Sequence, residues 1–298
     1  MLYNPKTDTR CIATFSIVGY DPATEEIGIA VQSKFPCVGN AVPWVKAGVG
    51  AVATQAWANT SFGPRGLELL EEGRTPDEVV KILTSEDEGY MHRQFGIVDA
   101  RGRSATFTGD ECLHWAGGIA GENFACQGNI LINKETVEAM AEAFATVQGD
   151  LAERLTMALM AAQEAGGDSR GMQAAALYIA KEGGGYGGYN DRYVDIRVDE
   201  HPSPIIELRR ILALYRILFY KTKPDNLVAL EGENQAFILS VLRKDGYYAG
   251  ADGAWSEGMQ KALDTFYSTE NFEERMAPFG QIDIEVIEYL KTLCAKNP

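Results

Sequence analysis

The sequence predicts an α+β fold: a four-layer α-β-β-α sandwich followed by a small, mostly helical C-terminal domain. Predicted strands come in consecutive hairpins with helices inserted in pairs, an order that favours two sheets covered by helices on their outer faces. The chain has neither the strict strand–helix alternation nor the early Gly-rich turn of a doubly wound nucleotide fold. Residues 221–224, with two lysines and a proline, separate the two predicted domains, 11–220 and 224–298.

The first predicted unit is a β-hairpin. Residues 11–19 alternate with the period of two that is typical of a strand, which places Thr14, Ser16 and Val18 on one face. A turn containing Asp and Pro follows, and residues 27–33 are predicted to return as the second strand.

The other elements follow in order along the chain. A third strand at 49–54 is rich in small residues and is expected to be packed on both faces. Pro64 favours the first turn of a helix that stops at Gly73, and Thr75 followed by acidic residues favours the start of a second helix, 79–83. Further strands are expected at 95–99, 104–108, 124–131, 173–180 and 193–198, and further helices at 135–147, 151–165, 204–220, 234–242, 259–266 and 282–293.

Charge and hydropathy limit the classes of partner. The chain has 42 acidic and 27 basic residues, a formal net charge of −15 and a pI near 4.7. Binding nucleic acid or anionic lipid needs clustered Lys and Arg, so neither partner is expected, and a small-molecule substrate or ligand fits better. No stretch approaches the roughly 20 apolar residues that span a bilayer, and the first ten residues lack the apolar core of a signal peptide. We therefore expect a cytoplasmic protein without a membrane partner.

Cysteine and histidine usage argues against a metal centre. The five cysteines are odd in number and include no C-x-x-C pair, which favours buried thiols in a reducing compartment. The three histidines lie far apart and outside any H-E-x-x-H arrangement, and the chain has no G-x-S-x-G elbow or phosphate-binding P-loop. No metal and no cofactor is expected.

Six short motifs, rich in Gly and polar residues, stand out from the rest of the chain. They are Thr14–Val18, Trp57–Asn59, Gln127–Asn129, Gly167–Gln173, Gly183–Arg192 and Asp199–Pro202. With these motifs the chain, over about residues 13–215, resembles a bacterial and archaeal family of unknown function placed in the Ntn (N-terminal nucleophile) hydrolase-like superfamily. The resemblance implies the same α-β-β-α sandwich that the strand order predicts. The tail resembles a peptidoglycan-binding-like module, on a pattern of Gly, Tyr and apolar residues between Leu242 and Phe266.

Ntn chemistry implies particular catalytic residues. The nucleophile is a Thr, Ser or Cys at a free N-terminus, whose α-amine, with a pKa of roughly 7.7–8, acts as the general base. The resemblance implies Thr14 in this role, with its amine released by cleavage after Ala13, and Ser16 is the second candidate. Gly128 and Asn129, at the end of a strand, are expected to offer a backbone N–H and an amide donor to an oxyanion.

The expected substrate-binding residues are polar residues or glycines of the same motifs and strands. Asp168 and Arg170 form a polar cluster able to hold a carboxylate or an amine, and the Gly-rich loop lets the backbone approach a ligand. The full set is Ser33, Asn59, Gly128, Asp168, Arg170, Tyr186 and Asn190. Structural interpretations stay open beside these roles: Thr14 and Ser16 as ordinary strand residues, Asn129 and Asn190 as turn residues, and Arg170 as an ion-pair partner of Asp168 or Asp191.

Two functions from different classes follow. The first is an Ntn-type amidohydrolase acting on a small amide or peptide-like substrate. The alternative is a non-catalytic small-molecule-binding or scaffold protein that keeps the Ntn fold, which the thirteen residues before Thr14 favour. A homodimer or higher symmetric oligomer is expected in either case.

Overall fold

The computed structural model describes residues 14–296. It divides into two compact units, with the division between Arg209 and Arg210, and each is described by itself below.

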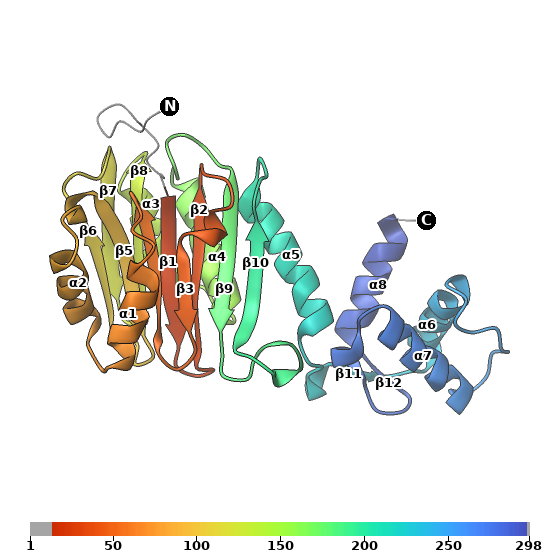
Figure 1. The fold of residues 1–298 in the computed structure, drawn as a ribbon. Coiled ribbons are helices and arrows are strands. Elements are labelled where there is room, and N and C mark those ends of the chain that lie inside the picture. Colours follow the sequence, from red (N-terminus) through yellow and green to blue (C-terminus); the bar gives the residue numbers. More distant parts are fainter. Residues whose placement is uncertain (1–13, 297–298) are drawn as a thin grey trace, which may run out of the picture. The chain divides into compact units, whose positions relative to one another are not determined.

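The first unit contains two antiparallel β-sheets (Figure 1). The larger sheet has the strand order β10-β9-β2-β1-β8-β7, so that β1 lies in its interior between β2 and β8. The strands of this sheet are β1 (Thr14–Asp21), β2 (Glu26–Ser33), β7 (Trp115–Gly121), β8 (Phe124–Leu131), β9 (Ala174–Ala180) and β10 (Arg192–Val198). The smaller sheet has the order β3-β4-β5-β6, formed by β3 (Pro43–Lys46), β4 (Gly50–Ala56), β5 (Arg93–Asp99) and β6 (Ser104–Thr108).

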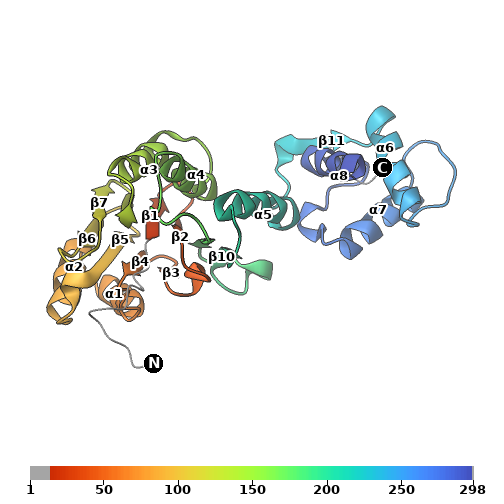
Figure 2. The ribbon, with the colours of Figure 1, turned by 90° about the horizontal axis from the view of Figure 1, so that it is seen from above.

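Helices cover the outer face of each sheet, as the view from above shows (Figure 2). Helices α3 (Glu135–Thr146) and α4 (Leu151–Glu164) pack on the six-stranded sheet, where a Cβ on Gly19 of β1 would lie 2.8 Å from the Phe144 ring. Helices α1 (Phe62–Glu71) and α2 (Pro76–Ser85) pack on the four-stranded sheet. The predicted four-layer α-β-β-α sandwich is therefore confirmed.

Apolar side chains from both sheets fill the space between them. Val18, Ile29 and Val31 of the larger sheet share one buried cluster with Ala51 and Ala53 of β4. Every residue of β4 is buried, which confirms the expectation that this strand is packed on both faces. Small side chains suit this position because a strand between a helix layer and a second sheet leaves little space on either side.

Local sequence signals account for some of these elements and miss others. The predicted start of α2 is a full capping box, in which the Thr75 side chain accepts from the Glu78 N–H and the Glu78 carboxylate from the Thr75 N–H. Strands β3 and β7 were not predicted, because β3 is short and begins at a proline and β7 is rich in glycine. The glycines of β7 allow close packing: a Cβ on Gly118 would lie 2.5 Å from the Thr106 hydroxyl of β6.

The second unit is mostly helical. Its described elements are the C-terminal part of α5 (Pro204–Phe219), α6 (Gly232–Lys244), α7 (Glu257–Thr269) and α8 (Ile284–Lys296), with a two-stranded sheet of β11 (Leu227–Ala229) and β12 (Gln281–Asp283). One core holds these elements together, with Leu242 from α6, Phe266 from α7 and Ile287 from α8 buried in it. The three helices predicted for the tail are present; the small sheet, with three residues per strand, was too short to predict.

The division between the units falls inside α5, before the predicted linker at 221–224. The end of α5 belongs to the second unit because Leu218 packs against its core and Arg275 binds its last carbonyls. Arg275 Nε donates to the Ile217 carbonyl at 3.0 Å and Nη2 to the Arg216 carbonyl at 2.7 Å. A linker signal marks where helical sequence ends, whereas side-chain contacts decide which core the helix joins.

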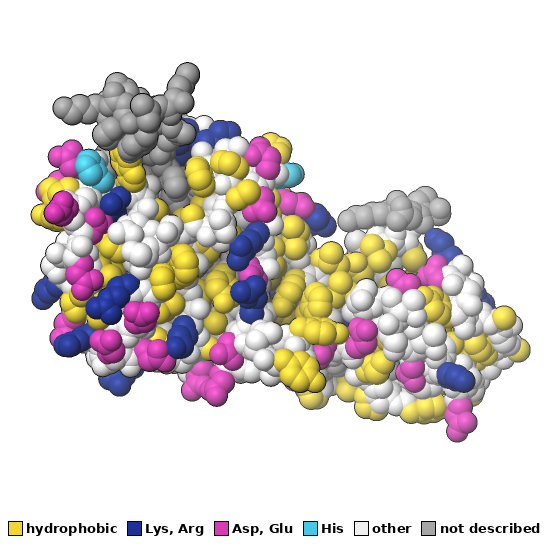
Figure 3. Space-filling view, viewed as in Figure 1, with side chains coloured by type: hydrophobic (Ala, Val, Ile, Leu, Met, Phe, Trp, Pro, Cys, Tyr) yellow, Lys and Arg dark blue, Asp and Glu magenta, His cyan; other side chains and the backbone are white. Residues whose placement is uncertain are grey.

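Charged side chains of both signs lie on the surface of the protein, and its thiols differ in exposure. Lys and Arg are interspersed with Asp and Glu on the face drawn in Figure 3. In the part of the chain that the structure describes, none of the helices combines the length and the apolar character that spanning a bilayer requires. The expectation of buried thiols holds for Cys126, whose pKa is raised to about 12 by burial, but is wrong for Cys37, which is exposed. Cys112 and Cys294 are partly exposed, and Cys11 lies outside the described residues.

Candidate functional site

Three polar side chains meet at one end of the larger sheet. Thr14 is the first described residue of β1, and its Cα partners are Ser33 on β2 and Asn129 on β8. The Thr14 hydroxyl donates to the Ser33 hydroxyl at 3.0 Å, and all three residues are buried. Because side chains alternate along β1, Thr14 shares the face of Val18, which packs toward the smaller sheet. Strand pairing thus brings together three of the predicted site residues.

Buried amides continue this polar region between the sheets. We call Ser16, Gln55, Gln94, Gln127 and Asn129 the polar ladder; each is at most 1% exposed. The Ser16 hydroxyl donates to Gln55 Oε1 at 2.5 Å and accepts from Gln127 Nε2 at 2.6 Å. Gln94 Oε1 accepts from Gln55 Nε2 and from Asn129 Nδ2, both at 2.9 Å. These bonds join β4 and β5 of one sheet to β1 and β8 of the other.

The polar ladder also holds the backbone of the site. Gln55 Nε2 donates to the Thr14 carbonyl at 3.2 Å, and Gln94 Nε2 donates to the Gly128 carbonyl at 2.7 Å. Gly96 of β5 leaves space for the ladder, because a Cβ there would overlap the amide of Gln127. Gln55, Gln94 and Gln127 were not among the site residues expected from the sequence. The signal that could have found them is a glutamine inside or directly beside an otherwise buried strand.

Asp168 and Arg170 belong to the same end of the sheet. The fully buried Asp168 carboxylate accepts from the Lys34 backbone N–H at 3.0 Å, directly after Ser33. It also accepts from the Arg170 backbone N–H at 2.9 Å and pairs with the Arg170 guanidinium at 3.1 Å. Of the two acids that the sequence offers as ion-pair partners of Arg170, Asp168 is therefore the one that forms the pair. The Arg170 side chain is partly exposed, so a cationic group lies at the surface close to the Thr14 end.

The backbone beside Asn129 adopts a conformation that is rare for its residue type. Ile130 has a φ of +51°, a left-handed value that a β-branched side chain seldom accepts. Its carbonyl accepts from the Ser169 N–H at 3.0 Å and from the Ser169 hydroxyl at 2.8 Å. Such strain is commonly retained at functional sites, where surrounding contacts maintain it. No local sequence pattern predicts this left-handed conformation of Ile130.

Asn59 lies at the corresponding end of the smaller sheet, where its side chain holds a turn. Its Nδ2 donates to Asp87 at 3.3 Å, and its Oδ1 accepts from the Ser61 N–H at 3.2 Å before α1. Asp87 in turn pairs with Arg93 at 2.7 Å, and these hydrogen bonds lower the pKa of Asp87 to about 2. The contacts of Asn59 are those of a structural residue, and its binding role stays a prediction.

Tyr186 and Asn190 lie at the opposite end of the sheet from Thr14. Strand β9 starts beside Ser33 and ends beside Ile27, and the Gly-rich loop with both residues follows that far end (Figure 1). The structure therefore does not bring these two predicted binding residues to the Thr14 end. Sequence motifs carry no information on which end of a sheet a loop occupies until the strand directions are known.

The fold and the Thr14 end define the chain as an α-β-β-α sandwich protein with a buried polar site at the start of a central strand. Residues 14–208 match a family model described as "Family of unknown function (DUF1028)", and the chain belongs to this family. Residues 218–290 match a model described as "Putative peptidoglycan binding domain". Both resemblances expected from the sequence are thereby confirmed at the level of family and tail module.

A solved relative supports the assignment. The crystal structure of protein SPO2555 from Silicibacter pomeroyi, described as a DUF1028 protein, is 29% identical with a TM-score of 0.62. The match covers 76% of this chain and 93% of that chain. A search of curated proteins found no match.

Proposed function

We propose that this protein is an Ntn-type amidohydrolase acting on a small amide or peptide-like substrate, with Thr14 as its nucleophile. The observation that carries the proposal is the position of Thr14 at the start of a central strand, between Ser33 and Asn129 and facing the second sheet. A hydroxyl nucleophile and a neighbouring amide donor are two of the groups that acyl transfer uses, and the α-amine of Thr14, once freed, would be the general base. The α-β-β-α layers match those that the resemblance to Ntn hydrolases implies.

Catalysis in this proposal begins with maturation. In the intact chain the Thr14 nitrogen is part of a peptide bond and cannot act as a base. Hydrolysis of the bond after Ala13 adds one water, leaves a carboxylate on Ala13 and frees the amine of Thr14. That amine, with a pKa of roughly 7.7–8, can then accept the proton of the Thr14 hydroxyl near neutral pH.

The acyl-transfer steps use the same atoms. Thr14 Oγ1 attacks the substrate carbonyl, the tetrahedral intermediate expels the amine product with a proton returned from the α-amine, and water hydrolyses the resulting ester. Ser33, which accepts from Thr14 Oγ1 at 3.0 Å, orients the hydroxyl. Asn129 Nδ2 carries two protons; one donates to Gln94, which leaves the other to stabilise the oxyanion.

Thr14 is a better nucleophile candidate than Ser16. The Ser16 hydroxyl donates to one glutamine and accepts from another, so removing its proton would break the polar ladder. Thr14 is the first described residue of β1, so cleavage directly before it would place its hydroxyl and a free amine on the same terminal residue. Because Thr14 is fully buried in the intact chain, the proposal requires that processing opens the site.

The test combines mass measurement with variants. Intact mass and N-terminal sequencing after prolonged incubation should show loss of residues 1–13, and the processed protein should hydrolyse a member of a small-amide panel. Thr14→Ala should abolish both events, whereas Thr14→Ser, which keeps the hydroxyl, should retain them in part. A stable full-length mass with unchanged amide hydrolysis in Thr14→Ala would reject Thr14 as the nucleophile.

A second candidate function is a non-catalytic binding or scaffold protein that keeps the fold. The complete burial of Thr14, together with the fully bonded Ser16 hydroxyl, favours it. In that case a ligand should raise the melting temperature of the full-length protein without being consumed. A molecule that is both bound and turned over would exclude this candidate.

The location, the partners and the oligomeric state of the protein are part of the same proposal. We infer a cytoplasmic protein with a small-molecule partner, no nucleic-acid or membrane partner, and a symmetric dimer or higher oligomer. The charge of −15 supports the inference that nucleic acid and anionic membranes are not partners. Light scattering tests the last part, since a monomeric mass would contradict it.

A further inference from the structure

A short segment, residues 168–172, crosses the end of the larger sheet at which Thr14 lies. Asp168 forms an isolated antiparallel bridge with Leu131 of β8. Its carboxylate accepts the backbone N–H of Lys34, directly after β2, at 3.0 Å. Because β1 lies between β8 and β2, these two contacts place Asp168 beyond the start of β1. The groups of this segment therefore border the candidate catalytic residues.

The Asp168 carboxylate has no acceptor position left for a substrate. Its Oδ1 accepts from the backbone N–H and the Nε of Arg170, at 2.9 and 3.2 Å. Its Oδ2 accepts from the Lys34 N–H and from Arg170 Nη2, at 3.0 and 3.1 Å. A carboxylate offers about four lone-pair positions, so these donors occupy all of them in a side chain that is fully buried. Of the two ligand groups that the sequence left open, an amine is therefore excluded at Asp168.

Lys34 supplies a positive charge at the same place. It is exposed, and its ammonium donates to the Met172 carbonyl, a neutral acceptor, at 3.1 Å. Within residues 14–296 no acid forms an ion pair with it. Since Arg170 and Asp168 neutralise each other, the three charged side chains together carry one net positive charge.

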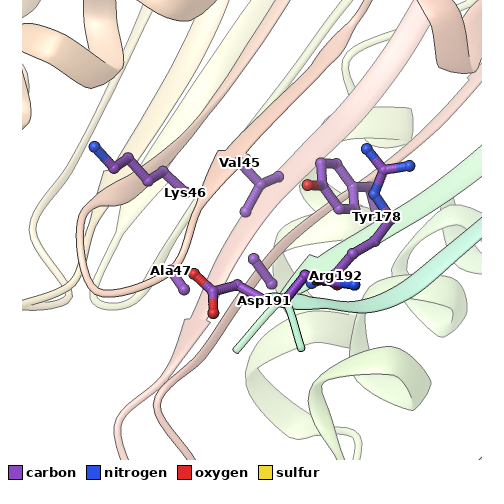
Figure 4. Close-up of a pocket in the computed structure, with 8 residues that line it drawn as sticks. Val45, Lys46, Ala47, Tyr178, Asp191 and Arg192 are labelled. Atoms are coloured by element: carbon purple, nitrogen blue, oxygen red, sulfur yellow. Dashed lines mark hydrogen bonds between the residues drawn. The ribbon is translucent and has the colours of Figure 1, made fainter. Parts of the chain in front are cut away.

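The cations at the opposite end of the sheet differ from Lys34. The pocket in Figure 4, where β9 ends, has Lys46 and Arg192 in its lining. Lys46 Nζ lies 2.6 Å from Glu71, and Arg192 Nη1 lies 3.3 Å from Asp195. Each of these cations already has an acid partner, whereas Lys34 can take an anion without breaking an ion pair.

One small molecule can reach both Lys34 and Thr14. Met172, which holds the ammonium, lies two residues before β9, and β9 is two strands from β1. Neighbouring strands are about 4.8 Å apart, so the ammonium and the Thr14 hydroxyl are about 10 Å apart. A contact of about 3 Å at each end leaves about 4 Å, the span of three extended covalent bonds.

We propose that the substrate of the Thr14 site is an N-acylated α-amino acid, whose carboxylate binds the Lys34 ammonium. This inference rests on the proposed amidohydrolase function and names its substrate class. In such a molecule three bonds join the acyl carbon to the carboxylate carbon, which is the span that the site allows. An uncharged amide of the same size would leave the ammonium without an anion and should bind more weakly.

N-acetylglycine and its uncharged counterpart N-acetylglycinamide test the proposal. Acetate release by the incubated protein gives kcat/KM, and ligand-observed NMR titration of the full-length protein gives binding. We expect kcat/KM about tenfold higher for N-acetylglycine, the effect of one charge-assisted hydrogen bond, with correspondingly tighter binding. Lys34→Met keeps the apolar stem without the charge and should abolish this preference through KM. Lys34→Arg keeps the charge and should retain most of the preference.

Lys81→Met is the matched control, because Lys81 is an exposed lysine on α2, which covers the other sheet. It should leave the preference within about twofold of the wild type. Acetate release without preference for N-acetylglycine would overturn the substrate class and leave the proposed function standing. If neither probe is hydrolysed, the proposed function fails and the titration decides: binding of N-acetylglycine that Lys34→Met abolishes supports the carboxylate site. No saturable binding, or equal weakening in Lys34→Met and Lys81→Met, would overturn it.

Discussion

Replacing Ser16 with alanine separates a structural serine from a catalytic one. The Ser16 hydroxyl makes two short hydrogen bonds inside the polar ladder, to Gln55 Oε1 at 2.5 Å and from Gln127 Nε2 at 2.6 Å. Ser16→Ala removes both and leaves the buried Gln55 Oε1 without its partner, whereas Gln127 Nε2 still donates to the Ser16 backbone carbonyl at 3.3 Å. An unsatisfied buried group costs about 1–3 kcal/mol, so the first unit should lose about 1–3 kcal/mol of unfolding free energy.

Even the lower limit is measurable. A loss of about 1 kcal/mol is a measurable part of the roughly 5–15 kcal/mol typical of a domain, and should lower the melting temperature by about 2–4 °C. Urea unfolding followed by tryptophan fluorescence is the assay, because Trp44, Trp57 and Trp115 lie in the first unit. A Trp255→Phe background removes the signal of the second unit.

The control is Ser85→Ala, which removes an exposed hydroxyl at the end of α2 and should change stability by less than about 0.5 kcal/mol. Any amide hydrolysis should persist in the folded fraction of Ser16→Ala. If the stability of Ser16→Ala lies within about 0.5 kcal/mol of the wild type, as for an ordinary surface substitution, the Ser16 hydroxyl does not stabilise the polar ladder. Unaltered stability with complete loss of hydrolysis would make Ser16, rather than Thr14, the nucleophile.

Three further predictions concern other parts of the chain. Arg275 and Asp283 form a buried ion pair at 2.8 Å, so Arg275→Ala should destabilise the second unit by about 3–5 kcal/mol. Trp255 fluorescence measures this loss. A double variant that also carries Asp283→Asn should recover part of it, because no unpaired charge is then left buried. The pKa of Asp87 is lowered to about 2, below its unfolded value near 4. Its contribution to stability is therefore complete above about pH 4 and is lost as the pH falls toward about 2. In Asp87→Asn the urea midpoint should fall less between these pH values than it does in the wild type. A Cβ at Gly96→Ala would overlap the amide of Gln127 and should cost about 1–3 kcal/mol of stability. Combined with Ser16→Ala, the two losses of stability should not add, because both changes act on Gln127. Full additivity would contradict a shared network.

Local sequence patterns were sufficient for the elements that carry the catalytic proposal. The period of two along β1 assigned Thr14, Ser16 and Val18 to one face, and the strand has that alternation. The Thr75 cap, the two helix pairs and the order of hairpins were visible for the same reason, because each depends on neighbours a few residues apart. Their order along the chain was enough to predict the layers of the sandwich.

Strand pairing decided which distant residues meet. Asn129 joins Thr14 only because β8 pairs with β1, and Asp168 joins Ser33 through the Lys34 backbone. The same pairing placed Asn190 at the far end of the sheet, although its motif looked equivalent in sequence. Alternation determines a side chain's face but carries no information on the partner strand or the end of the sheet.

The sequence by itself determined the composition of the layers, which residues share one face of β1, and the family that the chain resembles. Only the tertiary structure decided that Gln55, Gln94 and Gln127 join two sheets, and that α5 ends in the second unit's core. The physical reason is that amphipathic periodicity arises within one element, whereas hydrogen bonds between sheets and contacts between helices depend on where the chain returns. Buried glutamines are stable only when such returning strands satisfy their amides.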